Sequence, residues 1–422
     1  MLRPSRQIRI IIIFLCIGFS LLYLKTPKDH FINLDQFKYT LSGATYINIS
    51  ALFNHHISIQ NDPLLDILSH KAFSNNIYDV TVFPYFRRKS HRARRDEVTL
   101  TTWATYDRFD RLIDLATRNQ GTISVVIWIP PSDELATPQL IGLENLIREN
   151  SAISEKVDIH LVTSNRPLLH NTWRNIARSF ATTDWVMLWD IDFIICTDFQ
   201  AGLDTFKTSG DEKWVKQLAE GKAALVIPSF EWISGTEYHS CPKNKQDLVD
   251  NYRELKLDAF ETSNPVLSHA TDYTRYMQTD QPYKVTNFEF SYEVYAIFRK
   301  DINVWCDERF AGAGYNRAAC TASMYLSGMD FYVLADQWTI HQPHKSTSFE
   351  MRNSYDTAVS WKTFRMDLCH SVADNLAIQG LLHSTEGERI RTLCTEQEIP
   401  EINVDLSRLL RTSKEVASHM ST

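Results

Sequence analysis

Residues 184–195 read Asp184-Trp185-Val186-Met187-Leu188-Trp189-Asp190-Ile191-Asp192-Phe193-Ile194-Ile195, and this stretch decides the fold. Five bulky apolar residues run without a polar break into Asp190 and Asp192, and a second apolar run follows. An apolar run of this length is typical of a strand buried on both faces of a parallel or mixed sheet. In open α/β sheets the ligand crevice lies at the carboxyl ends of such strands. We therefore expect both carboxylates to lie where a ligand binds.

The spacing of these two carboxylates predicts a metal site. Like charges a few ångström apart oppose each other's ionisation, so such a pair is costly unless a cation offsets it. Carboxylate oxygens suit Mg²⁺ or Mn²⁺, which can also bridge to the phosphates of a nucleotide. The alternative is a strand end with solvated turn carboxylates, because an Asp-x-Asp motif also occurs by chance. The buried strand before the motif and the apolar residues after it favour the metal-nucleotide site.

Strand and helix patterns alternate on both sides of this motif. Strand patterns occupy residues 98–103, 123–129, 157–162, 223–228, 288–299, 328–334 and 338–340. Apolar residues at helical spacing occupy residues 106–118, 140–149 and 171–180, and the tail from 348 is also helical in pattern. The connection 234–286 has no clean period. Such alternation predicts an α/β fold with a mixed, mainly parallel central sheet and right-handed crossovers.

Composition and charge exclude some functions. Of the 422 residues, 44% are hydrophobic and 12% are aromatic, as in a globular protein with a substantial core. The formal net charge of -7 gives no reason to expect a nucleic-acid partner.

The N-terminus has the pattern of a membrane anchor. Arg3, Arg6 and Arg9 precede an apolar segment at 10–24. A helix of this length spans about 22 Å, and its flanks bring it closer to the ~27 Å of an early-secretory membrane. Arginines before the segment favour a cytoplasmic N-terminus. We predict a cytoplasmic tail at 1–9 and a signal-anchor transmembrane helix at 10–24; a cleaved signal peptide is the alternative.

The chain after the predicted anchor would lie in the lumen. Residues 25–96 are poorly patterned and are interpreted as a stem, which ends in the basic run 87–95. We interpret this run as a solvated and flexible boundary; processing by a basic-site protease and contact with an acidic membrane or glycan are the alternatives. Six cysteines could form three disulfides there, with pairings that the sequence leaves open. They are Cys196, Cys241, Cys306, Cys320, Cys369 and Cys394.

Several downstream segments form an ordered set of motifs. Arg174-Asn175-Ile176-Ala177 precedes the Asp-x-Asp, and further motifs follow it: Tyr283-Lys284-Val285, Phe290-Ser291-Tyr292-Glu293-Val294-Tyr295, Asp307-Glu308-Arg309-Phe310-Ala311-Gly312-Ala313-Gly314-Tyr315-Asn316-Arg317, Phe331-Tyr332-Val333-Leu334 and Ile340-His341-Gln342-Pro343-His344. Over residues 98–344 this set resembles the LARGE-type glycosyltransferases, glycosyltransferase family 49. The pattern departs from the family at Val294, where proline is usual, and at Trp189, where serine is common.

This resemblance implies a fold, an activity and a location. The fold would be GT-A, the nucleotide-diphospho-sugar transferase fold, over residues 97–345, with a helical extension of the catalytic domain at 346–422. The enzyme would be an inverting transferase that moves a sugar, glucuronic acid being favoured, from a UDP-sugar to a glycan or glycoprotein acceptor. It would be a single-pass type II protein of the Golgi membrane, held there by its N-terminal anchor.

The resemblance also gives roles to individual residues. Asp190, Asp192 and His341 would bind Mn²⁺, with Mg²⁺ as the alternative, because imidazole is an acceptable ligand for Mn²⁺ and unusual for Mg²⁺. His344 is a weaker candidate that could lie behind the ligands. The donor would contact Arg174, Asn175, Asp190, Ile191, Asp192, Gly312, Gly314 and Asn316.

Inversion also needs a base that takes the proton from the acceptor hydroxyl. Glu293, Asp307 and Glu308 are candidates, and the motif favours Glu293. Three alternatives to this function remain open. One is a transferase that uses UDP-GlcNAc, UDP-Gal or GDP-mannose, another is a catalytically silent glycan-binding or scaffold protein, and the third is a metal-dependent hydrolase.

Overall fold

The computed structural model describes residues 38–41, 44–47, 79–233, 240–261, 270–344 and 354–395, and the single residues 399, 402, 406, 407 and 409. The predicted cytoplasmic tail and anchor helix at 1–24 lie outside these residues, as does most of the predicted stem. Among the helices of the described ranges, none has the length and apolar character needed to span a bilayer.

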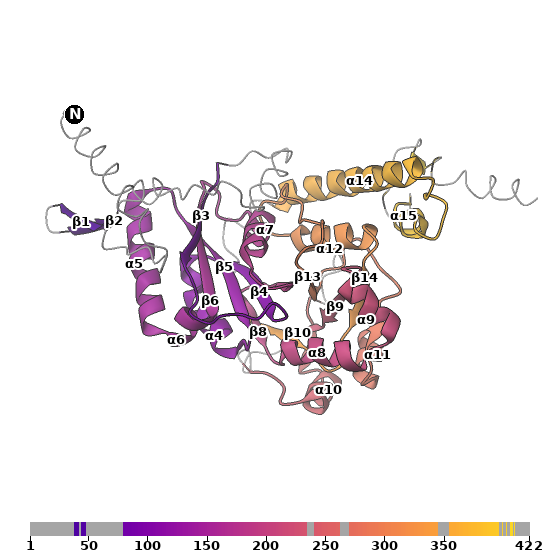
Figure 1. Ribbon diagram of the computed structural model, residues 1–422, viewed down its shortest axis with the longest axis horizontal. Coiled ribbons are helices and arrows are strands. Elements are labelled where there is room, and N and C mark those ends of the chain that lie inside the picture. The colour runs from indigo at the N-terminus through magenta and orange to yellow at the C-terminus, as the bar shows by residue number, and fades with distance from the viewer. Residues whose placement is uncertain are drawn as a thin grey trace, which may run out of the picture.

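The main sheet of the described chain has nine strands in the order β12-β14-β9-β13-β7-β4-β5-β6-β3 (Figure 1). Strands β7, β4, β5 and β6 run parallel, as do β9 and β14, whereas β13 lies antiparallel between β7 and β9. This confirms a mixed α/β fold with a parallel-rich sheet. The strands are β3 (Thr81–Arg87), β4 (Val98–Ala104), β5 (Thr122–Ile129), β6 (Val157–Thr163), β7 (Trp185–Leu188), β9 (Ala223–Ile227), β12 (Tyr283–Lys284), β13 (Tyr295–Arg299) and β14 (Asp330–Val333).

Helices cover both faces of this sheet, which is why the central strand β7 is apolar throughout. Met187 packs with the cluster under α4, α5, α8 and α9, while its neighbours Val186 and Leu188 pack on the opposite face, under α10, α11 and α12. Helix α7 also lies on β4 and β5. The helices are η3 (Tyr106–Arg108), α4 (Phe109–Arg118), α5 (Asp133–Glu149), α6 (Ser151–Lys156), α7 (His170–Phe180), α8 (Phe199–Ser209), α9 (Glu212–Ala219), α10 (Lys245–Arg253), α11 (Tyr273–Gln278) and α12 (Asn316–Leu326).

A smaller sheet carries the late histidine motif. Its strands follow the order β11-β10-β15-β8, with β8 (Phe193–Ile195), β10 (Ser229–Trp232), β11 (Leu257–Ala259) and β15 (Thr339–His341). Strand β15 pairs with β8 on one side and with β10 on the other, so His341 lies opposite Phe193 and opposite Glu231. Because β8 follows the Asp-x-Asp directly, this pairing places His341 close to Asp192.

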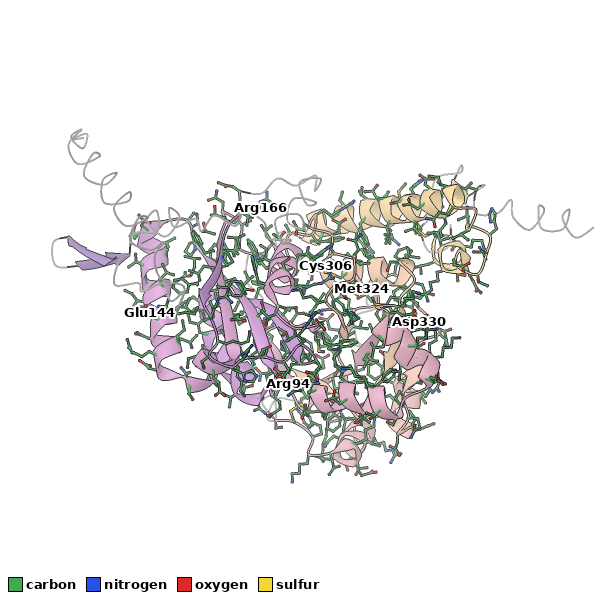
Figure 2. The ribbon with its side chains drawn as sticks, viewed as in Figure 1. Arg94, Glu144, Arg166, Cys306, Met324 and Asp330 are labelled. Carbon is green, nitrogen blue, oxygen red and sulfur yellow. A yellow bond between two sulfur atoms is a disulfide. The ribbon has the colours of Figure 1, made fainter. Side chains whose placement is uncertain are left out.

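The folded unit begins before the predicted domain boundary at residue 97. Strand β3 forms the edge of the main sheet, antiparallel to β6, with an irregularity in its register between Phe83 and Arg87. Most of its side chains are only half-buried, as expected of an edge strand, so its hydrophobic pattern is weak. Arg87 forms an ion pair of 3.0 Å with Glu144 of α5, which is labelled in Figure 2.

The basic run 87–95 also differs from the flexible boundary that we predicted. Lys89 forms an ion pair with Asp158 of β6, and both side chains are buried. The backbone N–H of Ser90 donates to the carbonyl of Ser154 over 3.0 Å. This part of the run is therefore docked on the sheet, because Asp158 and the end of α6 offer partners that lie far away in the sequence.

The predicted strand 288–299 and the irregular connection 234–286 differ from the structure, which has shorter elements in both. Only β13 forms within 288–299, and short elements interrupt the connection, among them α10, which Asn244 caps by accepting from the N–H of Asp247. The helical tail is confirmed in α14 (Ser354–Ile378) and α15 (Glu388–Leu393), and α14 lies over α12 in Figure 1. A hairpin, β1 (Lys38–Leu41) and β2 (Ala44–Ile47), precedes the main unit.

The six cysteines outside the predicted anchor form three disulfides, as predicted. The pairs are Cys196–Cys241, Cys306–Cys320 and Cys369–Cys394. The second of them joins α12 to the loop that contains Asp307 and Glu308, two of the candidate bases.

Candidate active site

Asp190 and Asp192 lie at the carboxyl end of β7, in the middle of the main sheet, as predicted. The chain leaves the strand at Trp189, whose backbone N–H donates to the carbonyl of Thr101 in β4 over 2.9 Å. The Trp189 side chain is fully buried and its ring lies 5.5 Å from that of Tyr295, centroid to centroid. This anchoring fixes the turn that carries the two carboxylates.

The Asp190 carboxylate is held by two buried guanidinium groups. Its Oδ1 lies 2.8 Å from Nη2 of Arg174 and 2.6 Å from Nη2 of Arg317, and the Tyr295 hydroxyl donates to Oδ2 over 2.9 Å. Burial alone would raise the pKa of Asp190, but the charges of Arg174 and Arg317 outweigh it and hold that pKa well below its usual range. Asp190 is therefore ionised and firmly fixed.

Asp192 has looser partners. Arg108 Nε lies 3.1 Å and Arg111 Nε 3.9 Å from its Oδ1, and Nε2 of His344 lies 3.5 Å from its Oδ2. Within the described chain, the buried Oδ1 accepts no hydrogen bond. The carbonyl of Asp192 accepts from the N–H of Gln342 over 2.8 Å, which joins the motif to the end of β15.

His341 also keeps a potential ligand atom. Its Nδ1 is buried without a hydrogen bond in the described residues, and the nearest carboxylate oxygen, Oε2 of Glu231, is 3.7 Å away. The chemistry of Asp192 and His341 thus fits Mn²⁺, which accepts carboxylate and imidazole ligands. Across the described ranges, however, no three His, Cys, Asp or Glu side chains are gathered as a metal-binding group. Asp190 faces arginines, so the structure does not bring the three predicted ligands together on one point.

A small pocket lies next to this site. Phe260 lines it, and the Phe260 ring lies 4.5 Å from the His341 ring, centroid to centroid. Glu293 also lines it, and burial raises the pKa of Glu293 from 4.5 to about 7, against the lowering effect of Arg317. The remaining lining residues are Val226, Ile227, Pro228, Ser229, Thr271, Tyr273, Tyr292 and Val294.

The other two candidate bases are placed differently from Glu293. The Asp307 carboxylate lies 2.9 Å from Nε of Arg309, and the Glu308 carboxylate accepts from the Asn175 amide over 3.0 Å. Asn175 also donates to the carbonyl of Cys306 and accepts from its N–H. None of these residues lines the pocket. Asn175 therefore braces the 306–308 loop against α7, and its contact with the donor stays a prediction.

The glycine-rich segment leads into α12 and reaches the same cluster. Gly312 and Gly314 have φ of 99° and 97°, values at which a side chain would be strained. Asn316 begins α12, and its side-chain oxygen accepts from Arg174. Ile191 lies between the two aspartates and is buried in the main core, so its side chain is a packing residue. Arg174 contacts Asp190, and Asn316 contacts Arg174, so both belong to the group of side chains around Asp190. Ile191 contributes only its backbone to the site.

Comparison with known proteins decides the family. A family model described as "Glycosyl-transferase for dystroglycan" matches residues 97–169 and 164–374. The chain belongs to glycosyltransferase family 49. It is a glycosyltransferase, which confirms the resemblance seen in the sequence.

Relatives of this family 49 enzyme include the xylosyl- and glucuronyltransferase LARGE2 of Rattus norvegicus, 30% identical over 60% of this chain and 35% of the relative. The glycosyltransferase-like protein gnt14 of Dictyostelium discoideum is 28% identical over 60% of this chain and 38% of the relative. The matches therefore span little more than a third of these two proteins. Among solved structures, S. aureus TarS 1-349 in complex with UDP-GlcNAc covers 76% of this chain and 87% of its own, with 12% identity and a TM-score of 0.38.

Some residues of the family 49 site were not among the predicted ones. Arg317 and Tyr295 hold Asp190, and Arg108 and Arg111 face Asp192. Arg317 and Tyr295 belong to the quoted motifs, where a charged and a hydroxyl-bearing side chain could have been recognised as candidate site residues. Arg108 and Arg111 lie three residues apart, just after the predicted strand 98–103. This spacing places both on one side of a helix and could have indicated them.

The two aspartates are expected to differ in their effect on stability. Asp190→Asn should lower the free energy of unfolding by about 3 kcal/mol at pH 7, because it leaves Arg174 and Arg317 buried without their counter-charge. Asp192→Asn should cost about 1 kcal/mol or less, since its partners are more exposed. The folded pKa of Asp190 is depressed, so the Asp190→Asn deficit should shrink as pH falls below about 4. Urea unfolding of both variants measures this; equal losses would contradict the assignment.

Proposed function

We propose that this family 49 glycosyltransferase moves a sugar, glucuronic acid being favoured, from a UDP-sugar to a glycan acceptor with inversion and with Mn²⁺. One observation carries the proposal. Asp192 Oδ1 and His341 Nδ1 have no hydrogen bond in the described residues, and His341 lies against Phe260 of a pocket that contains a carboxyl group with a pKa of about 7. The mixed sheet, with the Asp-x-Asp at the end of a central strand, supports a GT-A arrangement.

Asp192 and His341 would hold the metal through Oδ1 and Nδ1, the atoms that lack hydrogen bonds. Bound Mn²⁺ would act as a Lewis acid on the leaving diphosphate. Asp190 then has a supporting role, because it keeps Arg174 and Arg317 at the same end of the sheet as charged groups. Their guanidinium groups favour negative charge there, as a nucleoside diphosphate requires.

Glu293 would take the proton from the attacking acceptor hydroxyl. A carboxyl group with a pKa of about 7 is partly ionised at neutral pH and is a stronger base than an ordinary glutamate. Across the described residues, no hydrogen bond or ion pair occupies the Glu293 carboxylate, so it is available to an acceptor in the pocket. Tyr273, which is half-buried and also lines the pocket, offers aromatic surface for a sugar ring.

The choice of donor and the location rest on a relative's name and on the disulfides. LARGE2 carries xylosyl- and glucuronyltransferase in its name, which favours UDP-glucuronic acid or UDP-xylose as the donor. Three disulfides suit the oxidising lumen of the secretory pathway, where the predicted N-terminal anchor at 10–24 would hold the enzyme in the Golgi membrane.

Thermal unfolding of the full chain with a panel of nucleotide sugars tests this function. The panel contains UDP-glucuronic acid, UDP-xylose, UDP-GlcNAc, UDP-Gal and GDP-mannose, each with Mn²⁺ and with EDTA. A ligand at 100 times its Kd should add about 2.7 kcal/mol of stability. We expect stabilisation by UDP-glucuronic acid that EDTA removes. Stabilisation by none of the panel would favour a glycan-binding protein, and consumption of a donor without an acceptor would favour a hydrolase.

A further inference from the structure

Two arginines of the first helical segment face the second aspartate. Arg108 ends η3 and Arg111 lies in the first turn of α4, directly after the central strand β4. Their side chains are 19% and 20% exposed. Arg108 Nε donates to Asp192 Oδ2 over 3.4 Å and lies 3.1 Å from Oδ1, whereas Arg111 Nε lies 3.9 Å from Oδ1. The longest of these distances is an ion pair without a hydrogen bond, so Asp192 does not fully satisfy Arg111.

The charges at this end of the sheet do not balance. Asp190 lies against Arg174 and Arg317, and Asp192 lies against Arg108 and Arg111, so four guanidinium groups face the two carboxylates inside the site. A third carboxylate, that of Asp107, pairs with Arg108 over 2.7 Å, but it is 60% exposed at the surface. Glu293 lowers this positive excess by one charge at most. An excess of buried positive charge is costly unless an anion enters the site.

Arg111 has a donor atom that could bind such an anion. Its Nη1 is buried and, within the described residues, has no hydrogen-bond partner. An unsatisfied buried donor is costly, and more so when the group is charged. Such an atom in a substrate site indicates a ligand group that accepts from it.

We propose that Arg108 and Arg111 form a binding site for an anionic group of the donor. This inference rests on the proposed function. When Asp192 binds the metal, the two arginines would bind the donor substrate. The group is either the carboxylate of a uronic acid or the diphosphate, since a guanidinium fork binds both through paired hydrogen bonds. In the first case the pair selects glucuronic acid over neutral sugars; in the second it holds any UDP-sugar.

Calorimetric titration of the full chain with UDP, UDP-glucose and UDP-glucuronic acid, all with Mn²⁺, separates the two sources. Arg111→Gln is the main variant, Arg108→Gln is the second, and Arg111→Lys keeps the charge without the fork. Arg118→Gln is the matched control, because Arg118 lies on the same helix and pairs with Asp114 at the surface, where both side chains are 37% exposed. The melting temperature without ligand shows that each variant is folded.

We expect Arg111→Gln to weaken donor binding about tenfold or more, the effect of one lost hydrogen bond to a charged group, and Arg111→Lys to weaken it less. If only UDP-glucuronic acid is weakened, the group is the sugar carboxylate. If all three ligands are weakened by the same factor, it is the diphosphate. Binding by Arg108→Gln and Arg111→Gln equal to that of Arg118→Gln would overturn the inference. Failure of the unaltered chain to bind any of the three would instead overturn the proposed function.

Discussion

Asp192→Asn is expected to lower kcat for sugar transfer by about 10³-fold, the scale on which enzymes lose rate when one electrostatic stabiliser of the transition state is removed. The reason is the free and buried Oδ1 of Asp192, the carboxylate atom best placed for the metal. The fold should survive, because the partners of Asp192 are two arginines and a histidine that are 19–27% exposed and therefore keep contact with solvent. Steady-state formation of UDP with Mn²⁺, alongside a melting curve, measures both effects.

Asp204→Asn is the control for this experiment. Asp204 lies on α8 with its side chain 51% exposed, so the same chemical change is made away from the site. We expect it to keep the activity of the unaltered chain. Transfer by Asp192→Asn at more than about a tenth of the normal rate would show that Asp192 is not essential for the reaction.

Glu293→Gln is expected to lower kcat by about 10²–10⁴-fold with little change in the KM for the donor, because a general base acts on the acceptor proton. The unaltered enzyme should lose activity at low pH. Glu293 must be ionised to accept a proton, and its pKa is raised to about 7, so kcat should fall as pH decreases through this value. In Glu293→Gln this acidic limb should disappear from the pH profile.

The same variant should be more stable than the unaltered chain at alkaline pH. The folded pKa of Glu293 lies near 7 and its ordinary value is 4.5, so stability is lost as pH rises between these values. At ~1.4 kcal/mol per pKa unit, the gain in Glu293→Gln should be roughly 3 kcal/mol at pH 8 and should vanish near pH 4. Glu289→Gln, an exposed neighbour in the same segment, is the control. An unchanged pH profile with normal kcat in Glu293→Gln would leave Asp307 and Glu308 as the candidates.

The fold could be predicted where burial dominates the sequence. Residues 185–189 and 123–129 are apolar on both faces because helices cover both faces of the sheet, and these strands were predicted nearly to their ends. Strand β3 was missed because its edge position leaves most of its side chains half-exposed. The short strand β10 pairs with β11 and with β15, and the pairing of Ser229 with Thr339 joins distant parts of the chain, so no local pattern contains it.

The site could be predicted only in part, for a similar reason. The Asp-x-Asp and His341 follow apolar strands, so their location at strand ends was evident from the sequence. The division of roles between the aspartates was not evident, because it depends on Arg317, which lies 127 positions after Asp190. Likewise, Asp307 and Glu308 could not be separated from Glu293 until Asn175 and Arg309 were seen to hold them.

The most direct test of the proposed metal site is a titration of the full chain with Mn²⁺. The electron paramagnetic resonance signal of free Mn²⁺ is the readout. UDP-glucuronic acid is present or absent, and a sample without protein corrects for Mn²⁺ bound by the nucleotide. We predict that the chain with UDP-glucuronic acid removes one equivalent of Mn²⁺ from solution beyond the amount that the nucleotide binds, and that Asp192→Asn does not. Equal Mn²⁺ binding by Asp192→Asn, or no binding beyond that of the nucleotide, would contradict the metal site on which the proposed function depends.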